Sequence, residues 1–307
     1  MKCNIKWLCL LVIVCAVQSK AQDINADSLL NASTADTATT HRVQATFNST
    51  RLINSHTVGT TQGGVLDLRI SHRFGEFDDG FYNLFGLDFA SIRIGMDYGL
   101  TNRLTVGGGR SSYQKQYDGF LKYALLRQSE GEKNMPVSVT LLASVMFETD
   151  TSVAKSEKLI PVKPNTEDKF SYAYQLLIAR KFSDAFSLQL MPSLVHENLV
   201  DSTSPSNNIF SMGAAVRVRL TKRTGIIAEY YYTFPGTKIS GTYNSFSLGY
   251  EVETAGHVFQ IHLTNSNGMT EKNFIAETRG QWHGGDIRLG FNISRVFTIY
   301  KPKNIRM

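Results

Sequence analysis

Charged side chains recur at every second position in many segments of this sequence, the spacing that gathers them on one face of a β-strand. In residues 65–74, for example, Asp67, Arg69 and Arg73 alternate with apolar side chains. A face of this kind can pair acids with bases, or it can line a passage for small hydrophilic solutes. The candidates that the alternation places on the polar faces are Asp67, Arg69, Arg73, Arg93, Asp97, Lys122, Arg217, Arg219, Glu229, Glu251, His262 and Arg288.

A histidine-containing run offers a second kind of chemistry. The run from His262 to Gly268, HLTNSNG, resembles the His-x-Ser-Asn-Gly run of a twelve-stranded outer-membrane phospholipase, and this resemblance implies lipid hydrolysis. In that enzyme the nucleophile and its base face lipid, whereas the register derived below puts His262 and Thr264 on the polar face. A polar-face histidine opposite Gly249 is the plainer interpretation, so a lipid-acting esterase is kept as a minor alternative.

The other candidate motifs do not indicate a cofactor or a metal. The histidines outside that run have no ligand spacing, and Gly107-Gly108-Gly109 is followed by neither a helix start nor a Lys-Ser/Thr pair. The glycines are better explained by a strand that a neighbour approaches closely. We therefore expect no catalytic residue, no cofactor and no metal site. The scattered histidines are His41, His56, His257 and His283.

The first residues have the pattern of a cleavable secretion signal. An apolar run from Trp7 to Val17 follows Lys2 and Lys6 and precedes the small-x-small site that ends at Ala21. This run has about 11 residues, whereas a membrane-spanning helix needs roughly 20, which excludes a helical transporter. We expect residues 1–21 to be a signal peptide.

Removal of this signal changes what the composition implies. All 3 cysteines lie within it, so disulfide scaffolds, thiol enzymes and Cys-ligated zinc are excluded for the exported chain. Three lysines also leave, and the balance of 32 basic and 26 acidic residues falls from +6 to 29 − 26 = +3. The remaining charge is weak evidence for nucleic acid, and we expect no nucleic-acid partner.

From Gly64 onward, apolar and polar side chains alternate in blocks of about ten residues, which predicts about twelve strands. A water-soluble sandwich would explain many of these blocks individually. The predicted strands are residues 65–74, 90–100, 104–111, 118–127, 136–148, 170–181, 186–197, 209–220, 225–234, 245–254, 257–265 and 286–297.

The connections favour a barrel over a sandwich. Short connections alternate with mostly longer ones, and residues 128–135 are the one medium-length member of the short set. This alternation predicts an all-β fold, a transmembrane up-and-down antiparallel β-barrel with short periplasmic turns and long extracellular loops. Because every backbone group in lipid must be hydrogen-bonded, such a sheet closes on itself and turns its apolar face outward. The expected long loops are 75–89, 112–117, 149–169, 198–208, 235–244 and 266–285.

Two hairpins can be aligned from the pattern alone, since facing residues of an antiparallel pair point to the same side. Placing Leu220 opposite Ile226 predicts an inward ion pair between Arg217 and Glu229. Placing Val252 opposite Phe259, across the turn Ala255-Gly256, sets Tyr250 against Ile261, Leu248 against Leu263, Glu251 against Gln260 and His262 against Gly249. Gly256 suits the positive φ of a tight hairpin.

Closure of the barrel would bring its last and first strands together. Arg288, Arg69, Arg73 and Arg93 would then share one inner wall, which favours small hydrophilic and anionic solutes. The alternative is that the inward charges pair with one another and fill a narrow interior. Aromatic residues near strand ends fit interface girdles, although aromatics also suit strands in general. They are Tyr98, Tyr123, Tyr230, Tyr232, Tyr250 and Phe297.

Four stretches carry a resemblance to a known family: ATFNSTRLINSHTV (45–58), LDLRISHRFGEF (66–77), IRIGMDYGLTNRLTVGGGRSSYQKQYDGFLKY (92–123) and GGDIRLGFNISRVF (284–297). Together they are similar to an uncharacterised family of Gram-negative outer-membrane β-barrel proteins, a domain of unknown function. The resemblance implies a barrel and an outer-membrane location, and it implies no activity. Residues 286–297 are also similar to the C-terminal strand that the barrel-insertion machinery reads.

These observations divide the chain into a signal peptide (1–21), a lead-in (22–63), a barrel (64–300) and a C-terminal tail (301–307). The lead-in is a flexible periplasmic segment, or its residues 46–63 fold back as a lumen plug. Two functions remain open: a passive channel for small hydrophilic solutes, and a closed barrel that acts as a structural or surface-interaction platform through its long loops. The expected partners are outer-membrane lipid, the insertion machinery and a small solute.

Overall fold

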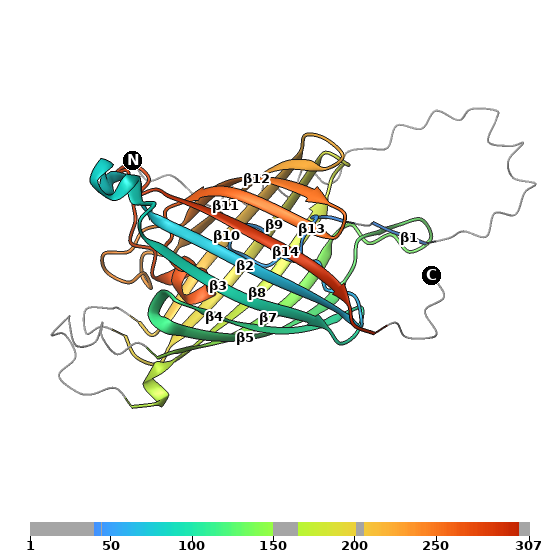
Figure 1. The fold of residues 1–307 in the computed structure, drawn as a ribbon. Coiled ribbons are helices and arrows are strands. Elements are labelled where there is room, and N and C mark those ends of the chain that lie inside the picture. Colours follow the sequence, from blue (N-terminus) through green and yellow to red (C-terminus); the bar gives the residue numbers. More distant parts are fainter. Residues whose placement is uncertain (1–39, 44, 150–164, 201–205, 301–307) are drawn as a thin grey trace, which may run out of the picture. The chain divides into compact units, whose positions relative to one another are not determined.

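Twelve antiparallel strands form a closed ring in the computed structural model, which describes residues 40–43, 45–149, 165–200 and 206–300 (Figure 1). The predicted signal peptide (1–21) and the predicted tail (301–307) lie outside the described residues. Around the ring the strands are β2 (Val65–Glu76), β3 (Ala90–Gly99), β4 (Leu104–Ser111), β5 (Gln116–Leu126), β7 (Ser138–Glu148), β8 (Phe170–Lys181), β9 (Phe186–Glu197), β10 (Asn208–Arg219), β11 (Thr224–Thr233), β12 (Phe246–Thr254), β13 (His257–Thr264) and β14 (Arg288–Thr298).

The predicted barrel is confirmed, with each strand boundary within two residues of its predicted place. The run 107–109 lies inside β4, and a Cβ at Gly107 would come within 2.6 Å of the Met96 carbonyl oxygen. The close approach of a neighbouring strand therefore explains these glycines. The ring closes where β14 pairs with β2, so the first and last barrel strands are neighbours, as the pattern predicted.

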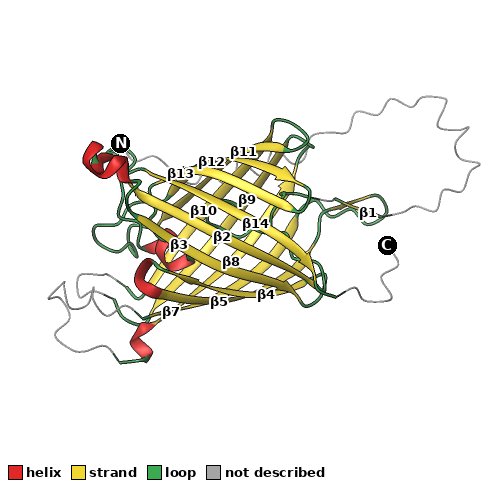
Figure 2. Cartoon of the chain, in the orientation of Figure 1, coloured by secondary structure: helices red, strands yellow, loops and turns green. Residues whose placement is uncertain are grey.

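The two ends of the barrel differ. The connections at one end, here called the short-turn end, include residues 100–103, 182–185, 220–223 and 255–256. The helical turns all lie at the other, long-loop end (Figure 2), and none of the described helices is long and apolar enough to cross a membrane. These turns are η2 (Phe77–Asp79), η3 (Phe81–Gly86), η4 (Tyr113–Lys115), η5 (Glu167–Lys169) and η6 (Lys272–Ala276).

A small second sheet lies outside the ring. Strand β1 (His41–Arg42) pairs with β6 (Ser129–Glu130), which belongs to the connection between β5 and β7. This connection is one of the short-turn set. The pairing therefore holds His41 and Arg42 beside the short-turn end.

The outward faces of the strands are apolar. Ile94, Leu121 and Ile261 are each about half exposed in the isolated chain, although they occupy the middle of their strands. Tyr250 and Phe259 flank the turn at 255–256, whereas Tyr230 and Tyr232 lie near the opposite end of β11. Aromatic side chains at both ends of an aliphatic band match the side chains that contact the two interfaces of a bilayer.

The inward faces divide into a polar and an apolar half. Strands β12, β13, β14, β2 and β3 turn charged, amide and hydroxyl groups inward. Strands β7 to β11 contribute a buried apolar cluster instead, and Gly213 allows the Tyr231 ring to lie against β10, because a Cβ there would be 2.5 Å from the ring. This cluster contains Leu142, Met146, Leu177, Met191, Val195, Ile209, Ile227 and Tyr231.

One of the two predicted hairpin registers is confirmed and the other is wrong. Between β12 and β13, Val252 pairs with Phe259 and Glu251 with Gln260, and Gly256 has φ +79°. Between β10 and β11, Val218 pairs with Ile226, so the prediction is off by two residues. The turn is tighter than expected because the Thr221 hydroxyl accepts hydrogen bonds from the backbone N–H groups of Arg223 and Thr224.

Candidate functional site

The interior of the ring is occupied by residues 46–62, here called the inner hairpin. The chain reverses at residues 52–55, where the Leu52 N–H donates to the Ser55 carbonyl at 2.8 Å, and the Thr57 N–H donates to the Thr50 carbonyl at 2.9 Å. Ile53, Ser55 and His56 are at most 2% exposed. Eight strands of the ring hydrogen-bond to this segment, so it lies within the lumen.

Both ends of the inner hairpin lie at the short-turn end. The Thr61 N–H donates to the hydroxyl of Thr105, near the start of β4, and the Gly64 N–H donates to the carbonyl of Gly99, the last residue of β3. Thr50, on the first leg, donates to Asp67, near the start of β2. The segment therefore enters from one rim, turns near the middle of the barrel and returns to the same rim.

The tip of the inner hairpin is bound by a buried carboxylate. Glu229 accepts hydrogen bonds from the Asn54 N–H at 2.8 Å, the Ser55 N–H at 3.3 Å and the Ser55 hydroxyl at 2.7 Å. The side-chain amide of Asn54 donates to Ser247 at 2.9 Å, and its oxygen accepts from Arg73 at 2.5 Å. Asn54 thus connects β11 and β12 to β2 across the lumen surface of β13 and β14.

Three cations of the wall are bound by neutral oxygens of the inner hairpin. Arg69 donates to the Leu52 carbonyl at 2.8 Å, Lys122 to the Thr50 carbonyl at 3.1 Å, and Arg73 to the Asn54 side chain. Within the described part of the chain, no carboxylate oxygen lies within 4.0 Å of these three cationic groups. Buried cations are usually paired with acids, so burying these three cations without one lowers the free energy of unfolding.

The returning leg is held by uncharged side chains. Gln189 donates to the His56 carbonyl at 2.7 Å and accepts from the Val58 N–H at 2.9 Å. The hydroxyl of Thr140 donates to the Val58 carbonyl at 2.8 Å. The Asn292 amide likewise donates to the Ile53 carbonyl at 3.0 Å, so side chains of the wall satisfy backbone groups of Ile53, His56 and Val58 that would otherwise be buried without partners.

Ten of the twelve predicted polar-face residues are buried within the ring, each at most 4% exposed. Arg219 lies at the short-turn rim near Asp184, and Arg288 lies at the long-loop rim, where it pairs with Glu76. The ten buried residues are Asp67, Arg69, Arg73, Arg93, Asp97, Lys122, Arg217, Glu229, Glu251 and His262.

The predicted ion pair between Arg217 and Glu229 is wrong. Because the register of β10 and β11 is shifted, Glu229 lies opposite Ala215, and Arg217 pairs with Glu251 on β12. Glu229 binds the inner hairpin instead. The other buried pairs join Arg93 to Asp118, on β5, and Arg51 of the hairpin to Asp97 at 3.7 Å.

A second insertion enters from the long-loop end. Residues 265–287, here called the inserted loop, place Phe274 against Tyr231 at 5.3 Å between ring centroids, and Phe274 and Ile275 are at most 1% exposed. We expected residues 266–285 to form a long extracellular loop. Its apolar residues instead cover the apolar half of the lumen, where burial of such side chains is favourable.

The inserted loop and the inner hairpin touch inside the barrel. The His56 imidazole lies 3.4 Å from the Glu271 carboxylate, and both side chains are at most 4% exposed. His56 also packs edge-on against Phe120, with 4.5 Å between ring centroids. The two insertions, which enter from opposite rims, are therefore in direct contact.

The inserted loop is fixed by one lysine. Lys272 lies 3.1 Å from Glu148 and 3.2 Å from Glu277. Burial alone lowers the pKa of Lys272, but the carboxylates of Glu277, Glu197 and Glu148 outweigh it and raise this pKa above its usual value. Burial raises the pKa of Glu277, and Lys272 outweighs that effect, so the pKa of Glu277 falls below 4.5.

We expect Lys272→Met to release the inserted loop, because a buried ion pair that loses one partner costs about 3 kcal/mol. Limited chymotrypsin digestion should then cut after Phe274, which is inaccessible in the docked loop. Since the folded-state pKa of Glu277 is lowered, its contribution is complete above pH 4.5 and is lost as the pH falls through the lowered value. Acid should therefore also expose Phe274. Equal protection of Lys272→Met and the exposed-site control Lys115→Met would contradict this assignment.

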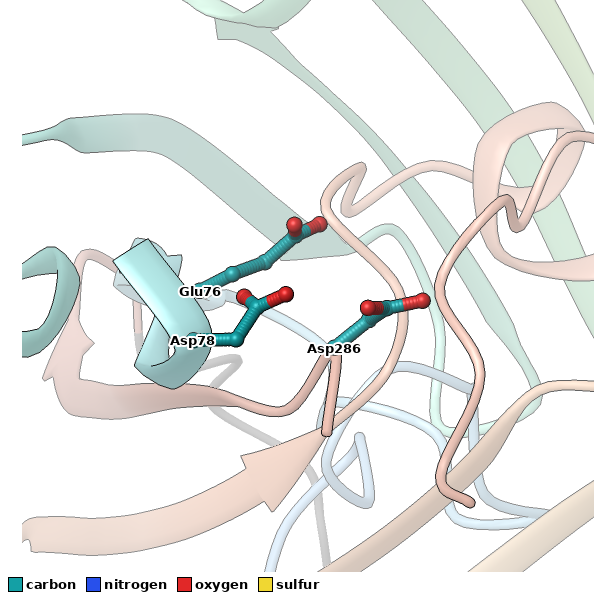
Figure 3. A group of neighbouring side chains, drawn as sticks. All are labelled: Glu76, Asp78 and Asp286. Carbon is teal, nitrogen blue, oxygen red and sulfur yellow. The ribbon is translucent and has the colours of Figure 1, made fainter. Parts of the chain in front are cut away.

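Three carboxylates meet at the long-loop rim (Figure 3). One oxygen from each of Glu76, Asp78 and Asp286 lies within 4.8 Å of the others. Glu76 also pairs with Arg288, and Asp286 accepts from the Gln281 N–H at 2.8 Å, so part of the negative charge is compensated. Sequence spacing gave no sign of this group, because it forms only when β14 closes against β2.

The geometry around His262 is not that of a nucleophile and its base. His262 lies opposite Gly249, as predicted, and neither imidazole nitrogen has a hydrogen-bond partner in the described residues. The hydroxyl of Thr264 accepts from Ser247, and that of Ser266 donates to the Gly268 carbonyl. A nucleophile and its base must lie within hydrogen-bond reach, and these groups are bonded elsewhere.

A closed antiparallel ring with an apolar exterior and a polar, occupied interior is the architecture of a membrane β-barrel. Residues 47–297 match the family model described as "Membrane bound beta barrel domain (DUF5777)". The chain belongs to this family. The search of curated proteins gave no match.

Solved structures with a similar fold include outer-membrane barrels. One titled "KdgM porin" has a TM-score of 0.44 at 9% identity, covering 77% of this chain and 99% of that one. The outer membrane protein Omp33 of Acinetobacter baumannii has a TM-score of 0.40 at 9% identity, covering 77% and 100%. LpxR from Salmonella typhimurium has a TM-score of 0.31 at 9% identity, covering 76% and 99%.

Proposed function

We propose that the protein is a passive outer-membrane channel for small hydrophilic solutes that its own inner hairpin holds closed. The observation that carries this proposal is the inner hairpin itself, whose polar groups bond to eight strands around the lumen. A polar wall suits the passage of hydrated solutes. With the segment in place, the polar half of the lumen is filled.

Two features support reversible closure. Both legs of the inner hairpin leave at the short-turn rim, so the segment can withdraw without threading its end through the barrel. The hairpin also buries Phe47, Leu52, Ile53 and Val58, but its bonds to the charged groups of the wall are made through neutral oxygens. Water can replace such partners far more easily than it can replace apolar packing.

The orientation follows from the same proposal. The short-turn end, where both termini of the described barrel lie, faces the periplasm, and the long-loop end faces outward. Residues 1–21 act as the export signal, and the barrel-insertion machinery recognises β14. The apolar outer face contacts outer-membrane lipid. No catalytic role is assigned, since the groups around His262 are not arranged for one.

The test compares two refolded chains in planar lipid bilayers. A chain that starts at Thr40 keeps the inner hairpin and should remain silent, whereas a chain that starts at Gly63 lacks it and should give discrete conductance steps. Slower migration on heating, which is typical of folded barrels, verifies assembly of both. Silence from the well-folded shorter chain would reject closure by the hairpin.

The second candidate function is a closed barrel that presents its loops as a binding platform. The packing of Phe274 and Ile275 into the apolar half favours it, because this packing seals the long-loop end without the hairpin. If the chain that starts at Gly63 is silent, a further variant with residues 268–280 replaced by a short Gly-Ser linker decides the matter. Continued silence would favour the platform.

A further inference from the structure

We propose that the inner wall formed by β13, β14 and β2 is a binding site for small anions that carry carboxylate or phosphate groups. This inference rests on the proposed channel and names the solute class that its polar wall selects. Three neighbouring strands turn their polar side chains toward the lumen at three successive inward-facing positions. The group, here called the anion wall, consists of Arg69, Arg73, Gln260, His262 and Asn292.

The anion wall carries two guanidinium groups and no acid. Arg69 donates to the Gln260 amide oxygen at 3.0 Å, and Asn292 donates to the same oxygen at 3.0 Å. Arg69 and Arg73 have no carboxylate within 4.0 Å among the residues that the structure describes. A guanidinium presents its donors in a planar fork that matches a carboxylate or phosphate.

Several buried atoms of the anion wall are without partners. Arg73 Nε, Gln260 Nε2 and both ring nitrogens of His262 form no hydrogen bond within the described residues, although each atom is inaccessible. Unsatisfied donors at one place in a protein interior require an explanation, such as a ligand or ordered water. Arg73 and Gln260 each offer a free donor, a neutral His262 offers one donor and one acceptor, and Asn292 Oδ1 is a free acceptor among the described residues. An anion oxygen satisfies the donors, and a protonated carboxyl or phosphate oxygen satisfies the acceptors.

Glycine makes room for this arrangement. A Cβ at Gly290 would lie 2.3 Å from the His262 Nε2 atom and 2.8 Å from Arg73 Nη1. Any larger residue would push the imidazole and the guanidinium away from the strand. Gly290 also follows the one irregularity in the pairing of β14 with β2, which opens the ladder beside Arg73.

The inner hairpin covers the anion wall with neutral oxygens. The Leu52 carbonyl accepts from Arg69, and the Asn54 side chain accepts from Arg73. Ile53 lies over Gly249, where a Cβ would be 3.0 Å from its terminal methyl group. A carboxylate or phosphate in the same place would form charge-assisted hydrogen bonds, which are stronger than bonds to neutral oxygens. Such an anion therefore competes with the hairpin.

The acids nearest the anion wall project from other strands or from another level: Glu229 acts on the charge of Arg73, and Asp67 and Asp97 act on that of Arg69, although none forms an ion pair with either arginine in the described residues. Glu229 projects from β11 and binds the hairpin tip, while Asp67 and Asp97 face each other on β2 and β3, nearer the short-turn end. When the hairpin withdraws, Arg51 leaves Asp97, so that acid becomes available to Lys122 rather than to Arg73. The anion wall remains the part of the lumen with an excess of positive charge.

The experiment uses the chain that starts at Gly63, with citrate and inorganic phosphate as probes. Calorimetric titration in detergent should show binding of at least one probe. The probe that binds more tightly shows whether the wall prefers carboxylate or phosphate. The double variant Arg69→Gln/Arg73→Gln should weaken binding at least about tenfold, and Arg69→Lys/Arg73→Lys should recover part of it. The control Arg180→Gln/Arg223→Gln removes two exposed charges and should change nothing.

Ion selectivity gives a second readout. In a KCl gradient the reversal potential should indicate preference for chloride, and the glutamine variant should lose this preference. Conduction without binding or selectivity that depends on Arg69 and Arg73 would reject the anion-wall proposal and would be consistent with the proposed channel. Silence in bilayers together with Arg-dependent citrate binding would reject the channel and retain the wall. Absence of binding by the folded shorter chain would overturn the wall in either case.

Discussion

Replacing Glu229 with alanine is expected to release the inner hairpin from an otherwise intact barrel. The carboxylate accepts three hydrogen bonds from Asn54 and Ser55 in the middle of the lumen. Buried donors that lose their acceptor cost about 1–3 kcal/mol each, so the loss amounts to about 3 kcal/mol or more. The released population should rise roughly 100-fold.

Arg51 provides the measurement. It lies in the inner hairpin and is 4% exposed, so trypsin can cut after it only when the hairpin has left the lumen. The Glu229→Ala chain should be cut there and should show brief openings in bilayers. The control is Glu253→Ala, which removes a carboxylate near the short-turn end of β12. If Arg51 were equally protected in both variants, Glu229 would not hold the hairpin.

Gly99→Ala should release the same segment without removing a polar contact. A Cβ at Gly99 would lie 2.0 Å from the Gln62 carbonyl oxygen and 2.6 Å from that of Thr61. These atoms are backbone atoms of the returning leg, so the leg must move away from the rim. Insertion of extra volume at a packed contact typically costs about 1–3 kcal/mol.

Gly119→Ala is the matched control for this substitution. A Cβ at Gly119 would have Val145 as its nearest neighbour, at 3.7 Å, which is an ordinary contact. Gly99→Ala should be cut after Arg51 at least about five times faster than Gly119→Ala, while both retain heat-dependent migration. Equal cutting rates would mean that the rim tolerates the added methyl group and that the leg does not depend on Gly99.

The ring of strands could be predicted because membrane burial imposes one rule on every strand. Every second side chain of a strand faces lipid, so the period of two persists from β2 to β14. This period predicts the ends of each strand to within two residues. Because the number of strands is even, the first strand begins and the last strand ends at the same rim of the barrel. The register between β12 and β13 was also accessible, because a two-residue turn with a glycine leaves one pairing.

The register between β10 and β11 could not be predicted in this way. Shifting an antiparallel pair by two residues keeps every side chain on its own face, so the alternation cannot distinguish the two pairings. The hydroxyl of Thr221, which closes the turn, decided between them. The predicted partner of Glu229 was lost with that shift.

The segments that occupy the lumen could be predicted only in part. Fold-back of residues 46–63 was one of two alternatives, and no local pattern favoured it, because the contacts of Asn54 and Ser55 join residues about 175 positions apart. The inserted loop was expected at the surface. Its segment 272–276 contains Phe274 and Ile275, which are unusual in an exposed loop and could have indicated burial.

The contact between His56 and Glu271 has a consequence for communication across the bilayer. One of these residues belongs to a segment whose chain continues on the side of the short turns, and the other belongs to a loop that begins and ends on the opposite side. If the docked positions of the two are coupled, linkage requires that a molecule which fixes the loop also retains the hairpin. The barrel would then have the parts of a receptor, in which occupancy outside sets the freedom of a tail inside.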